Sequence, residues 1–224
     1  MIEISKYDCV FKIRENTSDE FVVREVMSGE YRKLDITPND IIVDFGLNIG
    51  IFTIYALKRG AKKVHSYEPD NENFSLAQYN IQKNGYKDKV LLHNLAVIGN
   101  DDKERTFALN GKKNKGAHSL LTKRGRSHKV VDCVNINTVL KTVQPTIIKM
   151  DVEGAEYECI KAVDSFAGIK QFIFEFHHAH LNDIKTHEKY NEILNLLRTK
   201  FEKVEARKDT KGAWVNVVYC VNAL

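Results

Sequence analysis

The chain has 224 residues, of which 43% are hydrophobic, so it is long and apolar enough for one α/β domain with a sizeable core. Its formal net charge of +4 is too small to favour or exclude a nucleic-acid partner, and its four cysteines form no CxxC or Cys/His spacing, which disfavours a zinc site and fits a reducing compartment. The N-terminus lacks the basic start and apolar core of a signal peptide, and no stretch approaches the roughly 20 apolar residues of a spanning helix, so we expect a cytoplasmic protein without a membrane segment.

A βαβ unit is the clearest element in the first half of the chain. Residues 41–45 form a β-branched apolar run that is typical of a strand buried on both faces. Gly46 and Gly50 bracket a turn, a helix follows over residues 51–58, and residues 63–67 form the next strand.

The rest of the chain continues to alternate between strands and helices. Helical spacing predicts an Asn-capped helix with a glycine stop over residues 71–85 and a strongly amphipathic helix over residues 187–201. Residues 1–37 form an N-terminal extension with a short β element and then a helix or turn at residues 28–36. Further strands are predicted over residues 89–97, 105–111, 129–140 and 170–180, and residues 146–163 should form a strand followed by a helix. Residues 201–209 and 213–224 should form a closing hairpin.

No linker rich in glycine and serine divides the chain, so we expect a single domain over residues 1–224 with all the strands in one sheet. Alternating strands and helices predict that this sheet is mostly parallel. Ligands of such sheets bind beyond the carboxyl ends of the strands. The polar residues near those ends are Asp44, Glu68, Asn94, Asp151 and residues 175–177.

The glycine turn favours one class of cofactor over another. A dinucleotide-binding turn needs three glycines so that the pyrophosphate can approach the backbone, but Asn48 stands where the second glycine would fall. Asp44 precedes the turn, and its carboxylate would repel phosphate but suit a cationic ammonium. Glu68 ends the next strand and would accept hydrogen bonds from both ribose hydroxyls. S-adenosylmethionine has an ammonium, a ribose and a carboxylate for the helix N-terminus, so it is the expected cofactor.

Several segments carry a resemblance to a known family. The segments "VDFGLNIGIFT", "YEPD", "LAVIG", "IIKMDVEGAE" and "FEFH", in this order and at these separations, resemble the FkbM family of S-adenosylmethionine-dependent methyltransferases from about Glu30 to the C-terminus. The resemblance implies a Rossmann-like methyltransferase fold, with a mostly parallel seven-stranded sheet that ends in a C-terminal antiparallel hairpin. One departure is Leu47, where the family usually has a small residue, and its side chain would narrow the turn. The expected cofactor-binding residues are Asp44, Gly46, Asn48, Gly50, Thr53, Glu68, Pro69, Asn94 and Ala96.

Candidate catalytic groups follow the fourth and fifth predicted strands. Asp151 would orient or deprotonate an acceptor hydroxyl, and Lys149 would lower the pKa of that hydroxyl. Glu153 would cap the next helix or bind substrate. The three side chains would share one face if the strand continues as far as Glu153. The neighbouring strand would bring His177, a candidate general base, near Asp151, with Glu175 on the same face as a substrate contact. The plainer alternative is a salt-bridged helix start. Asp151, Glu153 and His177 would also suit a divalent ion, but acids and histidine coincide at strand ends by chance, so we expect no metal.

Residues 111–129 hold seven Lys or Arg and no acid. They predict either a solvated loop or a lid that attracts an anionic acceptor, with Lys123 and Arg124 as substrate contacts. Aromatic residues for base stacking are absent from the loop, which weakens a nucleic-acid partner.

The combined prediction is an O-methyltransferase that acts on a hydroxyl of a small molecule, sugar or glycan, with S-adenosylmethionine as the donor. Two alternatives stay open. The first is an RNA or cap-like 2′-O-methyltransferase, which also needs a lysine and an aspartate near the acceptor. The second is a cofactor-binding module that does not catalyse.

Overall fold

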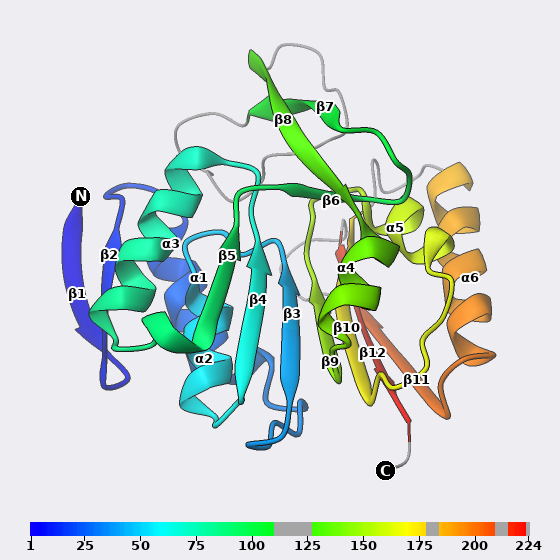
Figure 1. The fold of residues 1–224 in the computed structure, drawn as a ribbon, viewed down its shortest axis with the longest axis horizontal. Helices are drawn as coiled ribbons and strands as arrows, with labels where there is room; N and C mark the ends of the chain where they lie inside the picture. The colour runs from blue at the N-terminus through cyan, green and yellow to red at the C-terminus, as the bar shows by residue number, and fades with distance from the viewer. Residues whose placement is uncertain (110–126, 178–183, 209–214, 223–224) are drawn as a thin grey trace.

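A seven-stranded sheet forms the centre of the molecule, and the computed structural model describes residues 1–109, 127–177, 184–208 and 215–222 (Figure 1). The strands are β3 (Ile41–Phe45), β4 (Lys63–Tyr67), β5 (Val90–His93), β9 (Ile147–Met150), β10 (Gln171–His177), β11 (Lys203–Lys208) and β12 (Val215–Val221). They lie in the order β11-β12-β10-β9-β3-β4-β5. β5, β4, β3, β9 and β10 pair in parallel, whereas β12 is antiparallel to both β10 and β11. The predicted mostly parallel sheet with a C-terminal antiparallel hairpin is therefore confirmed.

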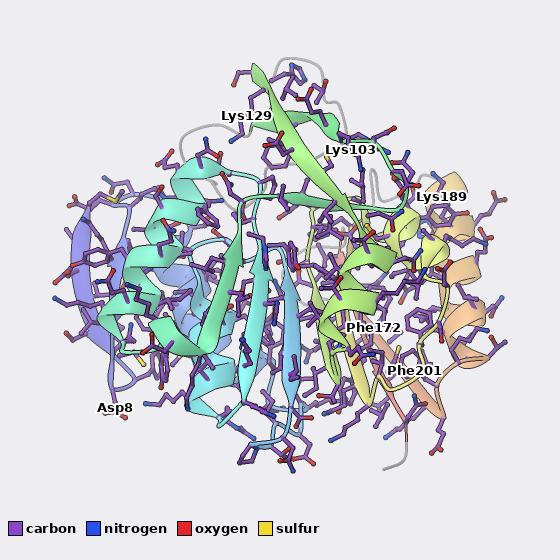
Figure 2. The ribbon with its side chains drawn as sticks, viewed as in Figure 1. Asp8, Lys103, Lys129, Phe172, Lys189 and Phe201 are labelled. Atoms are coloured by element: carbon purple, nitrogen blue, oxygen red, sulfur yellow. The ribbon has the colours of Figure 1, made fainter. Side chains whose placement is uncertain are left out.

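Helices cover both faces of this sheet, because successive strand residues point to opposite sides. Ile42 belongs to a core shared with α2 and α3, and Val43 belongs to a second core shared with α4, α5 and α6. Phe172 and Phe201 of the second core lie inside the molecule, whereas Asp8 projects from its surface (Figure 2). The helices are α2 (Ile51–Lys58), α3 (Asn71–Lys83), α4 (Ile136–Val143), α5 (Glu156–Ala162), α6 (Ile184–Arg198) and the one-turn η2 (Lys87–Lys89). None of the helices in the described ranges is both long and apolar enough to cross a membrane.

The N-terminal extension forms its own small sheet against α3. β1 (Ile2–Lys6) and β2 (Cys9–Ile13) make an antiparallel hairpin. Asn80 of α3 and Asn84, the residue that caps the C-terminus of α3, accept hydrogen bonds from the backbone of β2, at 2.7 Å from Lys12 N and 2.9 Å from Val10 N. Because α3 side chains satisfy this strand edge, the hairpin does not join the central sheet, and the expectation of one sheet for all strands is wrong.

The rest of the extension is tied to α3 by one buried arginine. It continues as α1 (Asp19–Glu25) and the π-helical turn η1 (Val26–Glu30). The predicted helix or turn over residues 28–36 overlaps only η1, and the helix α1 before it was not predicted. Arg14 binds Asp19 through both Nε and Nη2, and its Nη1 donates to Asn73 Oδ1 at 2.9 Å. The extension thereby reaches the first turn of α3.

A second small sheet stands over the end of the central sheet at which β4 and β5 finish (Figure 1). It consists of β6 (Ala96–Ile98), β8 (Ser127–Asn135) and β7 (Glu104–Leu109), in that order. The predicted strand over residues 89–97 is therefore divided, and between its halves Asn94 Nδ2 donates to the carbonyl of Glu68 at 2.7 Å.

Two predicted element boundaries are wrong because side chains cap helices there. The strand predicted over residues 129–140 ends at Asn135, whose side chain accepts a hydrogen bond from Asn137 N at 2.8 Å and starts α4. α3 is capped by Asp70 and not by the predicted asparagine, because Asp70 Oδ1 accepts from the backbone N–H groups of Glu72 and Asn73.

Candidate active site

The candidate site lies where the chain changes direction across the sheet. β3 has β4 on one side and β9 on the other, so the carboxyl ends of these strands meet at a topological switch point. The turn after β3 lies against the chain that follows β9. Gly46 has φ 87°, and a Cβ on it would lie 1.7 Å from the carbonyl oxygen of Asp151. Only glycine permits this approach.

The remainder of the turn is held from both sides. The amides of Gly46 and Leu47 both donate to Tyr67 O at 3.0 Å. Asn48 and Gly50 also have left-handed backbones, with φ 52° and 90°. The Leu47 side chain is buried in the core under α2 and does not line the pocket, so it does not narrow the turn in the way expected from the sequence.

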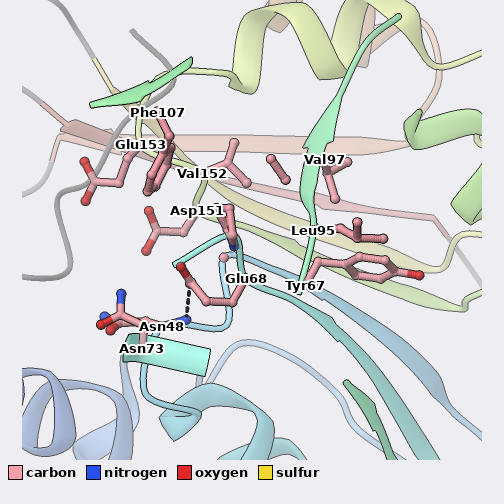
Figure 3. A pocket seen from close by; sticks show the side chains of 13 residues that line it. Asn48, Tyr67, Glu68, Asn73, Leu95, Val97, Phe107, Asp151, Val152 and Glu153 are labelled. Atoms are coloured by element: carbon pink, nitrogen blue, oxygen red, sulfur yellow. Dashed lines mark hydrogen bonds between the residues drawn. The ribbon is translucent and has the colours of Figure 1, made fainter. Parts of the chain in front are cut away.

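A pocket opens beside this turn (Figure 3). It is lined by Gly46, Asn48, Tyr67, Glu68, Pro69, Asn73, Leu95, Ala96, Val97, Phe107, Asp151, Val152 and Glu153. Of the predicted cofactor residues, five line it directly: Gly46, Asn48, Glu68, Pro69 and Ala96. The other predicted cofactor residues, Asp44, Gly50, Thr53 and Asn94, are absent from the lining and support it from behind.

Glu68 projects into the pocket from the end of β4. Its Oε2 accepts from Asn48 N at 2.8 Å (Figure 3). Its Oε1 accepts from Asp70 N at 2.9 Å. A carboxylate has about four acceptor positions, so each oxygen can still accept a hydrogen bond from a ligand. Burial raises the pKa of Glu68 to about 7, although the two backbone donors oppose this shift.

Behind the turn, Asp44 and Lys149 form a buried ion pair. Lys149 Nζ lies 3.1 Å from Asp44 Oδ1 and donates to the carbonyl of Gly46 at 2.7 Å. Thr53 Oγ1 donates to Asp44 Oδ2 at 2.7 Å. Burial raises the pKa of Asp44, an effect that Lys149 opposes; burial lowers the pKa of Lys149, but attraction to Asp44 and Asp151 carries it above its usual value. Both groups thus neutralise one another under the glycine turn, and neither lines the pocket.

The "DVEGAE" segment after β9 is a tight turn built around Glu156. β9 ends at Met150, so Lys149 and Glu153 do not share a strand face as the sequence suggested. Glu153 has φ 55° and Gly154 has φ 111°. The buried Glu156 Oε1 accepts from Val152 N at 3.2 Å and from Gly154 N at 3.0 Å, and lies 3.0 Å from His177 Nδ1. Its role was not predicted, although its position at the helix start was a usable signal.

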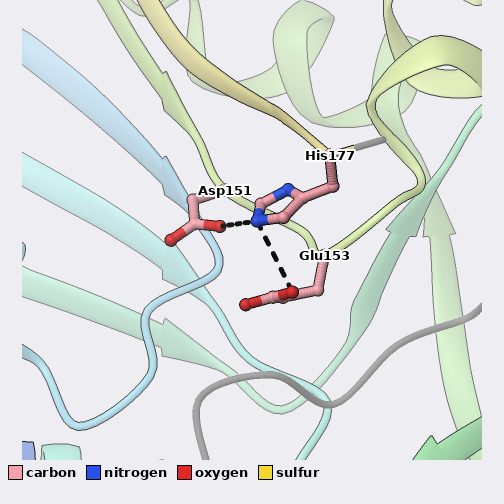
Figure 4. A group of neighbouring side chains, drawn as sticks. All are labelled: Asp151, Glu153 and His177. Atoms are coloured by element: carbon pink, nitrogen blue, oxygen red, sulfur yellow. Dashed lines mark ion pairs between the residues drawn. The ribbon is translucent and has the colours of Figure 1, made fainter. Parts of the chain in front are cut away.

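His177, at the end of β10, lies among three carboxylates. Its Nε2 is 3.8 Å from Asp151 Oδ1 and 3.5 Å from Glu153 Oε2 (Figure 4). The closeness of His177 to Asp151 agrees with the prediction from neighbouring strands. Burial lowers the pKa of His177, but the combined attraction of Glu153, Glu156 and Asp151 raises it well above its usual value. A pKa shifted in this direction favours the protonated imidazole, which is unfavourable for a general base.

The predicted substrate residues are divided between this cluster and the rest of the chain. Glu175 is partly buried on β10, and burial together with Asp151 raises its pKa well above the usual range. Lys123 and Arg124 lie outside the described residues. Lys129, from the same basic stretch, donates to Asp70 Oδ2 at 2.9 Å and to the carbonyl of Pro69, a lining residue of the pocket, at 3.3 Å.

Several lining residues escaped the sequence-based prediction. Phe107 comes from β7 of the small upper sheet, and no local pattern connects that strand to the glycine turn. Asn73 lies in the first turn of α3, where the Asp70 cap was the available signal. The remaining unpredicted lining residues are Tyr67, Leu95, Val97 and Val152.

The chain is similar in sequence to known methyltransferases. The family model described as "Methyltransferase FkbM domain" matches residues 44–204. A curated relative, the ribosomal protein L11 methyltransferase of Shewanella sp. (strain W3-18-1), is 37% identical over 60 residues. That match spans 27% of this chain and 20% of the relative, so the chain aligns with about a fifth of that protein.

Two solved structures show the same fold at low identity. The ribosomal protein L11 methylase from Lactobacillus delbrueckii subsp. bulgaricus has a TM-score of 0.51 and 17% identity, covering 92% of this chain and 81% of that chain. P. horikoshii TYW2, solved in complex with MeSAdo, has a TM-score of 0.52 and 16% identity, covering 98% of this chain and 70% of that chain.

Proposed function

The chain belongs to the FkbM methyltransferase domain family, and on that premise we propose that it transfers the methyl group of S-adenosylmethionine to a hydroxyl of a small molecule, sugar or glycan. The position of Asp151 carries the proposal. Its side chain lines the pocket beside Glu68, and the same carboxylate lies against His177 in the neighbouring cluster. One residue therefore joins a site for the donor to a site for the acceptor.

The residues of the pocket fit S-adenosylmethionine. Glu68 retains acceptor capacity for the ribose hydroxyls, and the buried Asn48 Oδ1 has no hydrogen-bond partner among the described residues, so a donor group of the cofactor would satisfy it. Leu95, Val97 and Phe107 offer apolar walls of the kind that hold an adenine ring. When bound, the cofactor supplies an activated methyl group on a sulfonium.

Behind the pocket, the Asp44–Lys149 pair keeps the glycine turn in place. Lys149 binds the carbonyl of Gly46 and so links the turn to β9, and Asp44 binds Thr53 and so links β3 before the turn to α2 after it. We assign both to positioning the turn. The contact between Asp44 and the cofactor ammonium, and the effect of Lys149 on the acceptor, stay predictions.

On the acceptor side, we assign proton removal to Asp151 in preference to His177. Asp151 belongs to the pocket lining, whereas His177 does not. His177 is bound through Nδ1 to Glu156, so its ring lies fixed beside the neighbouring carboxylates. Glu153 and Glu175 are proposed to contact the acceptor, together with Lys123 and Arg124 of the basic loop.

The carboxylates beside the pocket favour a hydroxyl-rich acceptor over a polyanion. Asp151 and Glu153 both line the pocket, and a phosphate backbone at this point would be repelled by them. An RNA 2′-hydroxyl is therefore the less favoured acceptor.

A transfer screen with labelled S-adenosylmethionine against sugars, glycans, small hydroxyl compounds and RNA tests the proposal. The proposal is supported if label appears in a neutral or sugar acceptor and the labelled methyl group is stable to mild base, as a methyl ether is. Label in RNA alone supports the 2′-O-methyltransferase alternative. No transfer to any of these acceptors, from protein that binds the cofactor, favours the non-catalytic module.

A further inference from the structure

Three side chains at the acceptor end of the pocket have the chemistry of metal ligands. Each of Asp151, Glu153 and His177 offers one ligand atom, and these atoms all lie within 4.8 Å of one another (Figure 4). No other such group occurs in the part of the chain that the structure describes. We propose that these three residues bind a divalent cation of the Mg²⁺ or Mn²⁺ class.

The two separations from His177 Nε2 to the carboxylate oxygens fit a shared ion better than direct hydrogen bonds. His177 Nε2 is 3.5 Å from Glu153 Oε2 and 3.8 Å from Asp151 Oδ1. A charged N–H···O hydrogen bond is about 2.7 to 2.9 Å long. A metal ion bound at about 2.0 to 2.2 Å from each ligand holds neighbouring ligand atoms roughly 3 to 4 Å apart.

His177 is oriented as metal-binding histidines usually are. Its Nδ1 lies 3.0 Å from Oε1 of the buried Glu156, which leaves Nε2 directed toward Asp151 and Glu153. Histidine ligands commonly donate their second N–H to a carboxylate, which fixes the ring and its tautomer. Glu156 is itself fixed by the amides of Val152 and Gly154, so the ring orientation is built into the turn.

A second feature is an unsatisfied ligand atom. Asp151 Oδ1 is buried, and no described residue forms a hydrogen bond with it. A buried carboxylate oxygen without a partner is costly, and a cation between it and His177 Nε2 would satisfy it. The side chains of Asp151 and Glu153 nevertheless remain 29% and 27% exposed, so an ion here would keep open coordination positions.

Two carboxylates and one imidazole select among the common cations. Carboxylate oxygens suit Mg²⁺ and Mn²⁺, and an imidazole is accepted most readily by Mn²⁺ of the two. At the open positions the ion would bind a hydroxyl or a vicinal diol of the acceptor and make that hydroxyl easier to deprotonate. This role rests on the proposed transfer, whereas binding of the ion does not.

Titration with Mn²⁺, followed by the electron paramagnetic resonance signal of the free ion, tests the site on protein without cofactor or acceptor. We expect the wild type to deplete the free signal stoichiometrically. Glu153→Gln keeps the size of the side chain and should weaken binding by at least about tenfold. Glu202→Gln is the matched control, because this exposed glutamate lies before β11 at the opposite end of the sheet, and it should bind as the wild type does.

Melting curves in chelator show whether each variant is folded. The proposal is overturned if the wild-type protein leaves all the Mn²⁺ free. It is also overturned if Glu153→Gln binds Mn²⁺ as tightly as the wild type does, whether or not this variant is folded. If Glu153→Gln fails to fold, Asp151→Asn takes its place with the same expected weakening. A failed acceptor screen leaves Mn²⁺ binding intact, and absent Mn²⁺ binding leaves the cofactor measurements intact, so the two proposals fail separately.

Discussion

The carbonyl oxygen of Asp151 lies so close to Gly46 that a Cβ on residue 46 would be 1.7 Å from it. The contact joins the glycine turn after β3, where we propose that the cofactor binds, to the segment after β9, where we propose that the acceptor binds. A change at Gly46 must therefore disturb both sites together.

Gly46→Ala should unfold the turn or abolish cofactor binding. The control is Gly60→Ala, because Gly60 has a similar left-handed φ of 103° but nothing within 4 Å of its Cβ position. That control should cost only the conformational strain, about 1 to 2 kcal/mol. Urea unfolding and calorimetric titration with S-adenosylmethionine measure both effects. Equal unfolding free energies and equal affinities in the two variants would contradict the assigned contact.

S-adenosylmethionine should stabilise the fold and NAD should not. At a hundredfold excess over its dissociation constant, a ligand adds about 2.7 kcal/mol to the free energy of unfolding, or roughly 5 to 10 °C in Tm for a chain of this size. Melting curves with each ligand make the comparison. A Tm that rises with NAD and ignores S-adenosylmethionine would reject the cofactor assignment.

Cofactor affinity should depend on Glu68 and on pH. Burial raises the pKa of Glu68 from 4.5 to about 7, so between these values the folded chain holds a proton that the unfolded chain has lost. The contribution of Glu68 to stability therefore falls as pH rises through this window. Ribose hydroxyls donate to the ionised carboxylate, so cofactor affinity should rise with pH up to about 7 and then level off.

Below pH 7, binding of the cofactor should release a proton from Glu68. Calorimetry in two buffers of different ionisation enthalpy measures this proton release. Glu68→Gln removes the titrating group, so its affinity should be about ten- to a hundredfold weaker at pH 8 and nearly independent of pH. Proton release that persists in Glu68→Gln would assign the titration to another group.

Asp151→Asn should separate binding from transfer. The variant should retain cofactor affinity within a few fold but lose about 10²- to 10⁴-fold in kcat on the acceptor that the screen identifies, because the carboxylate acts on the acceptor proton. Asp132→Asn, on the exposed face of β8, is the control and should turn over normally. Normal kcat for Asp151→Asn would show that another group removes the proton.

Glu156→Ala should destabilise the turn after β9. It leaves the amides of Val152 and Gly154 and the ring of His177 without their shared acceptor, at a cost on the order of 2 to 4 kcal/mol. Glu158→Ala, two residues along the same helix, is partly exposed and should cost much less, although it loses its pair with Arg105. Denaturant unfolding compares the two, and similar losses would argue against a special role for Glu156.

The sequence was informative where local pattern and tertiary structure agree. The strand and turn from Ile41 to Gly50 could be predicted because the apolar run of the strand and the positions of the two glycines both indicate the same βαβ unit. The approach of His177 to Asp151 followed from the adjacency of two consecutive parallel strands. Both are short-range consequences of one sheet topology.

Sequence pattern failed where distant side chains decide the structure. The N-terminal hairpin stays separate because Asn80 and Asn84, far along the chain, bind its edge strand. The strand expected over residues 89–97 divides at Asn94, whose partner is the carbonyl of Glu68. The buried ion pair between Lys149 and Asp44 was not predicted, because it has no local signature in the sequence.

The limits of the family match do not coincide with the limits of a stable structure. Residues 44–204 omit Arg14, which fastens the extension to Asn73 in the pocket wall, and they omit β12. Because β12 lies between β10 and β11, a protein trimmed to those limits would leave what remains of β11 without a neighbour and the β10 edge exposed. Crystallisation, domain fusion or transplantation of this site into another chain should therefore carry the segments on both sides of the matched region.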